Sequence, residues 1–171
     1  SYEHADDVSG QTMLKRNVKK LIACEGCSIA CDHFNIIDKG QYKGANASVD
    51  YESLWSLGPN CGINNVGAIT LAVQYCDTHG IDTISAGMTV SWAMECFEKG
   101  LITEEDLEGH TLKWGSLDDV EHFLNMIVNK RGIGAWFAGG TKRAAEKIGK
   151  GSEKFAMPVK GQEMSGYDGR W

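Results

Sequence analysis

Three cysteines stand close together in the stretch CEGCSIAC, at Cys24, Cys27 and Cys31. Three thiolates at C-x2-C-x3-C spacing can wrap one compact inorganic core. Iron–sulfur clusters are held by such runs, usually with a fourth cysteine from elsewhere in the protein. Zinc is the alternative, but it prefers two separated CxxC pairs or Cys/His pairs with a longer gap. The spacing therefore favours an iron–sulfur cluster over zinc and over plain structural cysteines.

The remaining cysteines do not suggest a fourth ligand. Cys76 and Cys96 sit in apolar helical stretches, where cysteine usually behaves as a small buried hydrophobe. Cys61, in GPNCG, could reach the cluster, but we expect it to be structural. His33 follows Cys31 by two residues, an awkward position from which to close a tetrahedral zinc site. We expect the histidines in general to be surface or structural residues, with His79 the one to watch.

A second group of polar residues lies in DTHGIDTIS, from Asp77 to Ser85. Asp77 and Asp82 could both face a ligand held where one helix ends and the next begins. A carboxylate can accept two parallel hydrogen bonds, and the 2-amino-pyrimidinone edge of a pterin presents that donor pattern. The alternative is a local role, because Asp is common at the N-cap of a helix.

Hydrophobic periodicity predicts a mostly helical fold that positions both groups. Apolar residues recur at helical spacing over 64–76, and Gly80 ends that helix. A second, nearly all-apolar helix is expected over 85–99. Capping-box patterns at Thr103 and Ser116 predict a short helix and then a longer one that Gly132 closes. A last helix is expected over 141–149, whereas 42–55 and 156–163 are expected to be extended or looped.

Composition limits the class of protein and its partners. The 171 residues, 42% of them hydrophobic, are enough for one domain with a real core. The net charge of −6 argues against nucleic acid as a partner. No apolar run is long enough for a membrane span, and no signal-peptide pattern is present. Metal-binding thiols suit a reducing compartment, so we expect a cytoplasmic protein. Because the chain starts at Ser1, we expect it to be part of a longer one.

Taken together, the motifs resemble those of the aldehyde ferredoxin oxidoreductase family, the tungsten-pterin enzymes. C-x2-C-x3-C is followed at the family's distance by D-x-x-G-I-D-T. Further agreement covers almost the whole chain: YESLWSLGPNCGI (51–63), GMTVSWAMECFEKGLI (87–102), the WG at Trp114, VKGQE (159–163) and YDGR (167–170). The resemblance implies that residues 1–171 are one irregular multi-helix segment from the helical middle of a longer enzyme. Residues 24–31 would be its iron–sulfur motif and 77–83 its pterin-binding turn.

The resemblance also implies roles for individual residues. Cys24, Cys27 and Cys31 match the ligands of a 4Fe–4S cluster. Glu52 matches an acidic residue near the metal that could transfer protons. The positions matching contacts to a tungsten (or molybdenum) bis-pterin are Asp77, Ile81, Asp82 and Lys160, with Ile81 contributing backbone atoms. The fourth cluster ligand would then lie outside this segment.

The implied function is two-electron redox of a small aldehyde or carboxylic acid, with electrons passed to ferredoxin or partner subunits in an oligomer or larger complex. One position departs from the pattern. Classical aldehyde-oxidising members tend to have a histidine where this chain has Pro158, which offers no proton and no donor. Other branches use the same cofactor on different substrates, so an active-site subunit of an aromatic acyl-CoA reductase is an alternative. A non-catalytic iron–sulfur electron-transfer module and a zinc-stabilised binding module are the others.

Overall fold

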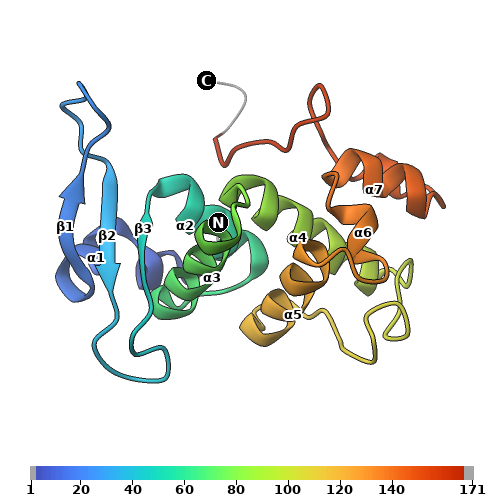
Figure 1. The fold of residues 1–171 in the computed structure, drawn as a ribbon, viewed down its shortest axis with the longest axis horizontal. Helices are drawn as coiled ribbons and strands as arrows, with labels where there is room; N and C mark the ends of the chain where they lie inside the picture. The colour runs from blue at the N-terminus through green and yellow to red at the C-terminus, as the bar shows by residue number, and fades with distance from the viewer. Residues whose placement is uncertain (1–2, 168–171) are drawn as a thin grey trace.

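A small sheet lies at one end of an otherwise helical molecule. The computed structural model describes residues 3–167, and Figure 1 shows the sheet beside α2 and α3, with α5, α6 and α7 at the opposite end. Helix α4 connects the two halves. The expected mostly helical fold is thus only roughly confirmed, because the sheet was not predicted.

The sheet is a three-stranded antiparallel meander in the order β1-β2-β3. The strands are β1 Val18–Ile22, β2 Asp32–Ile36 and β3 Asn46–Val49, and they follow η1 Ala5–Val8 and α1 Gly10–Arg16. The pairing of Ile22 with Asp32 closes the β1–β2 ladder, so residues 23–31 form the loop between these strands. Strand β3 lies within 42–55, the stretch expected to be extended or looped, whereas β1 and β2 were missed because each has only five residues and β1 carries two adjacent lysines.

Four of the predicted helices are confirmed, with shifted ends. They are α3 Val66–His79, α4 Thr83–Glu98, α5 Leu117–Val128 and α7 Thr141–Ile148. Gly80 ends α3 in the left-handed conformation, as predicted, and Gly149 follows α7. Helix α5 ends at Val128, before the predicted stop at Gly132. A four-residue helix, α6 Gly134–Phe137, and the short turns η2 Pro59–Cys61 and η3 Ser152–Lys154 complete the described elements.

Two local predictions were wrong. Tyr51–Leu57 forms helix α2 where an extended or looped stretch was expected, because Asp50 caps it: the N–H of Ser53 donates to Asp50 Oδ1 over 2.9 Å. The capping box at Thr103 exists, with the backbone N–H of Thr103 donating to Asp106 Oδ2 over 2.8 Å. However, only turns follow it, so a cap alone did not produce a helix here.

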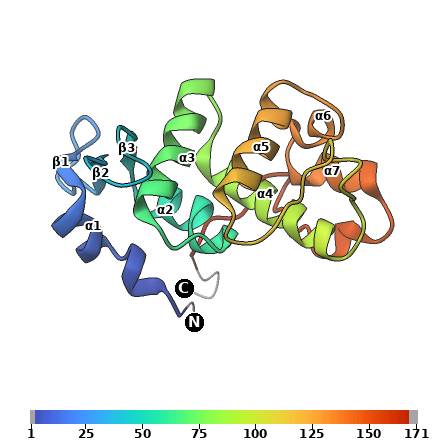
Figure 2. The same cartoon turned by 90° about the horizontal axis from the view of Figure 1, so that it is seen from below.

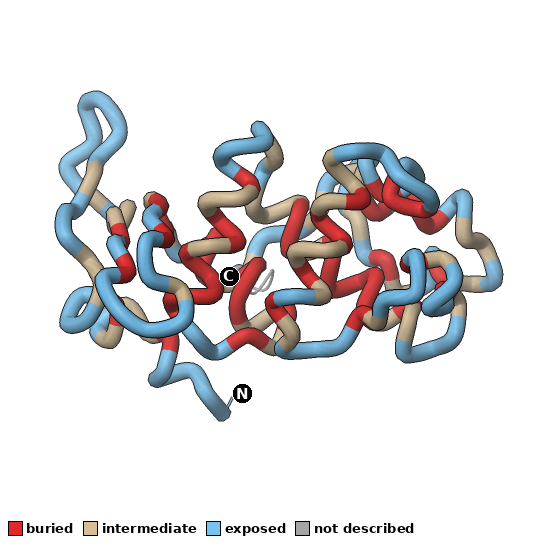
Figure 3. Tube along the Cα trace, turned by 60° about the horizontal axis from the view of Figure 1, so that its bottom comes forward, coloured by how far each residue is buried: buried red, intermediate tan, exposed pale blue. Residues whose placement is uncertain are grey.

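The core follows α3 and α4 through the centre of the molecule, where the tube in Figure 3 is mostly red. Helices α2 and α4 touch at backbone distance, since a Cβ placed on Gly87 would lie 2.4 Å from the carbonyl of Ser56. Trp92 is buried on α4 with its ring 5.5 Å from that of Phe137. None of the helices in the described part of the chain has the length and apolar character to cross a membrane.

The C-terminal segment, residues 155–167, has little regular structure, as predicted. It leaves the α7 end of the molecule and runs back over α4 towards α2, which both views show (Figures 1 and 2). A two-residue turn at Lys160 and Gly161, both with positive φ, reverses the chain between Val159 and Gln162, whose backbones exchange two hydrogen bonds.

Candidate functional site

The three cysteines of the predicted cluster all lie on the exposed loop between β1 and β2, and their thiols are free. Cys24 comes two residues after β1, and Cys31 directly precedes β2. Because neighbouring strands lie roughly 5 Å apart, the hairpin stem brings both ends of the loop together. The backbone N–H of Cys27 donates to the carbonyl of Cys24 over 3.0 Å, which turns the chain between the first two thiols.

The loop supplies three thiol ligands for a cluster, but these thiols are not already arranged around one metal position. Within residues 3–167, no three His, Cys, Asp or Glu side chains converge as metal ligands would. The donors nevertheless fit an iron–sulfur cluster, because three unpaired thiols on one projecting loop can close around it as it binds. Figure 1 shows this loop extending beyond the sheet.

The other three cysteines are buried, as expected. Burial raises the pKa of Cys61, Cys76 and Cys96 to about 12 in each case. The thiol of Cys61 also donates to the carbonyls of Ser56, over 3.3 Å, and Gly87, over 3.6 Å. These three thiols lie in the core whereas Cys24, Cys27 and Cys31 are exposed, so it stays our prediction that the buried three are structural and do not complete the cluster.

The turn at 77–83 is a compact helix-to-helix connection. The N–H of Ile81 donates to the carbonyl of Cys76 and that of Gly80 to the carbonyl of Asp77, which is the Schellman arrangement at a helix C-terminus. The side chain of Ile81 packs against the core, on a small apolar hollow of about 90 Å³. The backbone N–H of Ile81 is already bonded to Cys76, so its carbonyl is the backbone group left for the contact that stays predicted for Ile81.

The two carboxylates of this turn have different surroundings. Asp82 caps α4, accepting a hydrogen bond from the N–H of Ser85 on Oδ2 over 2.7 Å. The local role weighed for Asp82 is therefore real, although the cap uses one oxygen only. Partial burial raises the pKa of Asp77 above its usual value, and the nearby carboxylate of Asp32 raises it further. Asp77 thus lies close to the base of the cysteine loop, because Asp32 directly follows Cys31.

Glu52 is a buried carboxylate on the first turn of α2, with only 9% of its surface exposed. Its Oε2 accepts a hydrogen bond from the backbone N–H of Gly166 over 2.9 Å. Its Oε1 is buried and has no hydrogen-bond partner among the residues that the structure describes. Buried carboxylate oxygens are normally hydrogen-bonded, so Oε1 is available to accept a hydrogen bond from a group outside the described residues.

Short connections hold Glu52 near the other two groups. In the sheet, Val49 pairs with His33, two residues past Cys31, and α2 begins two residues after Val49. On the other side, Ser53 Oγ and Thr83 Oγ1 lie 2.8 Å apart, which joins the start of α2 to the start of α4. The cysteine loop, the 77–83 turn and Glu52 therefore gather around the α2 end of the molecule.

Lys160 does not lie with the cysteine loop, the 77–83 turn and Glu52. It lies in the turn of the C-terminal segment, and with Pro158, Lys142 and Glu146 it lines a separate hollow of about 310 Å³ near α7. The motif residue Arg170 lies outside the described residues. Glu163, in the same VKGQE motif as Lys160, has a structural contact: it accepts a hydrogen bond from the N–H of Thr141 over 2.7 Å at the start of α7.

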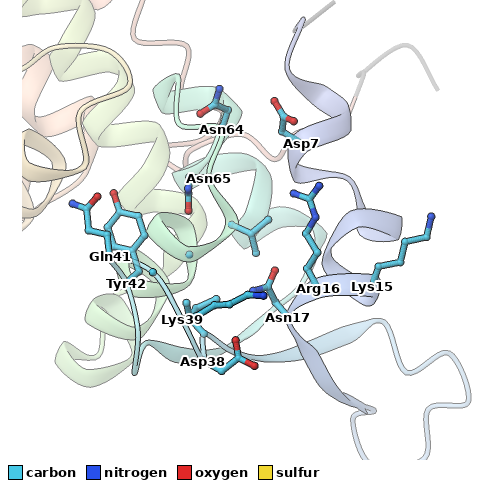
Figure 4. A pocket seen from close by; sticks show the side chains of 14 residues that line it. Asp7, Lys15, Arg16, Asn17, Asp38, Lys39, Gln41, Tyr42, Asn64 and Asn65 are labelled. Carbon is cyan, nitrogen blue, oxygen red and sulfur yellow. The ribbon is translucent and has the colours of Figure 1, made fainter.

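A larger hollow of about 740 Å³ lies on another face, between α1 and the start of α3 (Figure 4). Its lining includes Lys15, Arg16 and Lys39 together with Asp7 and Asp38. None of the predicted site residues lines it, so volume alone is a poor guide to the site in this fold.

Comparison with known proteins decides the family. The family model described as "Aldehyde ferredoxin oxidoreductase, domains 2 & 3" matches residues 1–171. The chain belongs to this family. Tungsten-containing aldehyde ferredoxin oxidoreductases of Thermococcus kodakarensis and Pyrococcus furiosus are each 35% identical over 170 residues, which is 99% of this chain but 27% of the relative's length. The chain thus spans about a quarter of these oxidoreductases.

Two further proteins are also similar to this chain. An "aliphatic sulfonate oxidoreductase, WOR-like subunit" of Pyrococcus furiosus is 38% identical over 149 residues, covering 84% of this chain and 24% of that protein. Among solved structures, the active site complex BamBC of benzoyl coenzyme A reductase, with 1,5-dienoyl-CoA, superposes with a TM-score of 0.73 at 27% identity. The match covers 90% of this chain and 22% of that one.

Two residues at the candidate site were not found from sequence. Asp32 could have been singled out, because it directly follows the last cysteine of the cluster motif. Gly166 gave no usable signal, since its partner Glu52 lies 114 positions away and the bond comes from the backbone.

Proposed function

We propose that this segment is the cofactor-binding middle of a tungsten-pterin, iron–sulfur oxidoreductase. The observation that carries the proposal is the buried Glu52: its Oε1 has no hydrogen-bond partner within residues 3–167, and the next residue, Ser53, contacts Thr83 of the 77–83 turn. A tungsten (or molybdenum) bis-pterin would supply the two-electron chemistry, and a 4Fe–4S cluster the single-electron transfer.

In this proposal each group of residues has one task. Cys24, Cys27 and Cys31 hold the cluster, with the fourth ligand supplied from outside residues 1–171. Asp77 and Asp82 accept hydrogen bonds from the pterin, whose amino-pyrimidinone edge donates in parallel. The closeness of Asp77 to Asp32 supports a short path between pterin and cluster.

Glu52 moves the proton that accompanies the redox step. Its Oε1 faces the reacting group and accepts or gives the proton, while the N–H of Gly166 holds Oε2. Glu52 is buried, so water competes little with the reacting group for its Oε1. Lys160 can reach the pterin only if the turn at 159–162 approaches it in the complete enzyme, so we assign this residue a secondary role.

The favoured substrate is a small aldehyde or the corresponding carboxylic acid, as the names of the 35% identical relatives suggest. Electrons would pass to ferredoxin or to partner subunits of a larger cytoplasmic complex. A second candidate, reduction of an aromatic acyl-CoA, is favoured by Pro158, which stands where the classical aldehyde-oxidising pattern has a proton donor, and by the similarity to the benzoyl coenzyme A reductase complex.

Elemental and pterin analysis of the native, complete enzyme tests the proposal. We expect tungsten or molybdenum together with pterin and iron. Iron without pterin, tungsten or molybdenum would replace the proposal with a non-catalytic electron-transfer module. One zinc per chain without iron would indicate the zinc-stabilised module.

A further inference from the structure

The C-terminal segment meets the candidate catalytic helix at Gly166. The N–H of Gly166 donates to Glu52 Oε2 over 2.9 Å, and the carbonyl of Gly166 lies 3.5 Å from the hydroxyl of Tyr51. One residue later, the ring of Tyr167 lies 5.3 Å from that of Tyr51. The backbone of Gly166 is therefore held on both its donor and its acceptor side by consecutive residues of α2.

We infer that Gly166 is a positioning residue for Glu52, an inference that rests on the proposed role of this glutamate. Its N–H fixes one carboxylate oxygen and so aims the other, Oε1, at the reacting group. A hydrogen bond between a backbone N–H and a carboxylate is stronger than a neutral one. In a buried site it selects one side-chain orientation among several, and correct orientation is a large part of proton-transfer catalysis.

The identity of the residue matters because of Trp55. A Cβ added to Gly166 would lie 2.6 Å from Trp55 Cδ2 and 2.9 Å from its Cγ. Cγ is the atom that joins the indole to the side chain, and Cδ2 lies where its two rings are fused. Neither atom can move unless the whole side chain turns. A larger residue must therefore displace either the indole of Trp55 or the C-terminal segment, and moving the segment lengthens the bond to Glu52. Glycine is needed here for close approach and not for its backbone dihedral angles.

A purely structural role for the contact is the competing explanation. In that case the contact only docks the C-terminal segment, and its loss would lower stability or cofactor content without changing the orientation of the carboxylate. The two explanations differ in the turnover rate measured with full cofactor loading, and in the vibrational signature of the Glu52 carboxylate.

The experiment uses the complete, tungsten-loaded enzyme with Gly166→Ala, Trp55→Ala, the double variant and Glu52→Gln. Gly10→Ala is the matched control, because nothing lies within 4 Å of a Cβ at that position. For each variant, kcat, KM and metal content are measured. An infrared difference spectrum identifies the Glu52 carboxylate band as the one absent from Glu52→Gln.

We expect Gly166→Ala to lower kcat by roughly tenfold to a hundredfold, part of the factor that general acid–base catalysis supplies. KM and metal content should change little, and the carboxylate band should shift. The double variant, in which the added methyl has room, should recover much of kcat and the band position. Gly10→Ala should match the unmodified enzyme.

The inference is overturned if Gly166→Ala keeps the original kcat and band while Glu52→Gln is inactive, a result that leaves the proposed function intact. It is also overturned if Gly166→Ala loses tungsten and the double variant does not restore it. If Glu52→Gln itself turns over with full metal content, the proton-transfer role fails. The carboxylate band of Glu52 in Gly166→Ala then tests the positioning role of Gly166 separately. A shifted band supports that role, and an unchanged band overturns it.

Discussion

Ser53 Oγ and Thr83 Oγ1 lie 2.8 Å apart and join the first turn of α2 to the first turn of α4. Ser53 follows Glu52, and Thr83 follows Asp82. The bond therefore fixes the candidate proton-transfer group relative to the candidate pterin-binding turn. A second bond, from Ser56 Oγ to the carbonyl of Thr83 over 3.0 Å, strengthens the same junction.

Replacing Thr83 with valine tests this junction. The valine keeps the shape of the threonine but leaves the partly buried hydroxyl of Ser53 without this partner. We expect a loss of about 1 kcal/mol in the free energy of unfolding, as for a typical hydrogen bond. Urea unfolding of the complete enzyme measures it. An unchanged midpoint and slope would mean that the two hydroxyls contribute nothing to stability.

The contact of α2 with α4 predicts a larger effect at Gly87. A Cβ there would lie 2.4 Å from the carbonyl of Ser56, so Gly87→Ala must push the helices apart. We expect it to lower the free energy of unfolding by roughly 1–3 kcal/mol, the usual cost of overpacking. Gly10→Ala, with open space around it, is the control and should not be destabilising. Equal stability of the two variants would contradict the packing described for this interface.

Cysteine substitutions separate cluster ligands from core residues. Cys27→Ser should remove most of the iron and the visible absorbance of the cluster, because one of the three proposed cluster ligands is lost. Cys96→Ala should keep the iron, since this thiol is buried and burial raises its pKa to about 12. Iron analysis after purification without oxygen measures both. Loss of iron from folded Cys96→Ala would show that the ligand set is wrong.

The raised pKa of Asp77 should make the free energy of unfolding depend on pH. Partial burial and the Asp32 carboxylate raise the pKa of Asp77, so the folded state binds this proton more tightly than the unfolded state. Its contribution to stability is therefore complete below the ordinary carboxyl pKa and is lost as the pH rises through the raised value. Because Asp77 is largely exposed, the effect should be small.

In Asp77→Asn this fall in stability should disappear, and Asp32→Asn should reduce it. Unfolding free energies measured across the acid range on the pterin-free enzyme provide the check. A slope that persists in Asp77→Asn would contradict the coupling. In the loaded enzyme the same variant should retain less pterin, because an amide accepts fewer hydrogen bonds than a carboxylate.

Several parts of this site could be predicted from sequence because they depend on neighbours in the chain. The cysteine spacing, the left-handed Gly80 and the cap of α4 are local features with known residue preferences. Strands β1 and β2 were missed because five residues, half of them polar, carry little periodic signal. The bond between Glu52 and Gly166 could not be predicted, since it depends on how the C-terminal segment returns over α4.

The position of Lys160 shows another limit of the sequence. The family motif places it with the pterin residues, yet the described residues put its turn near α7, beside Lys142. A motif records which residues share a function in a whole enzyme, whereas this segment includes only part of that enzyme.

The most direct test of the account is turnover by Glu52→Gln in the complete enzyme. Glutamine keeps the size of the side chain and an oxygen for the N–H of Gly166, but it cannot exchange a proton. We expect turnover to fall by at least about a hundredfold, as for loss of a general acid or base, with tungsten, pterin and iron content unchanged. Turnover at the original rate with the same cofactor content would contradict it.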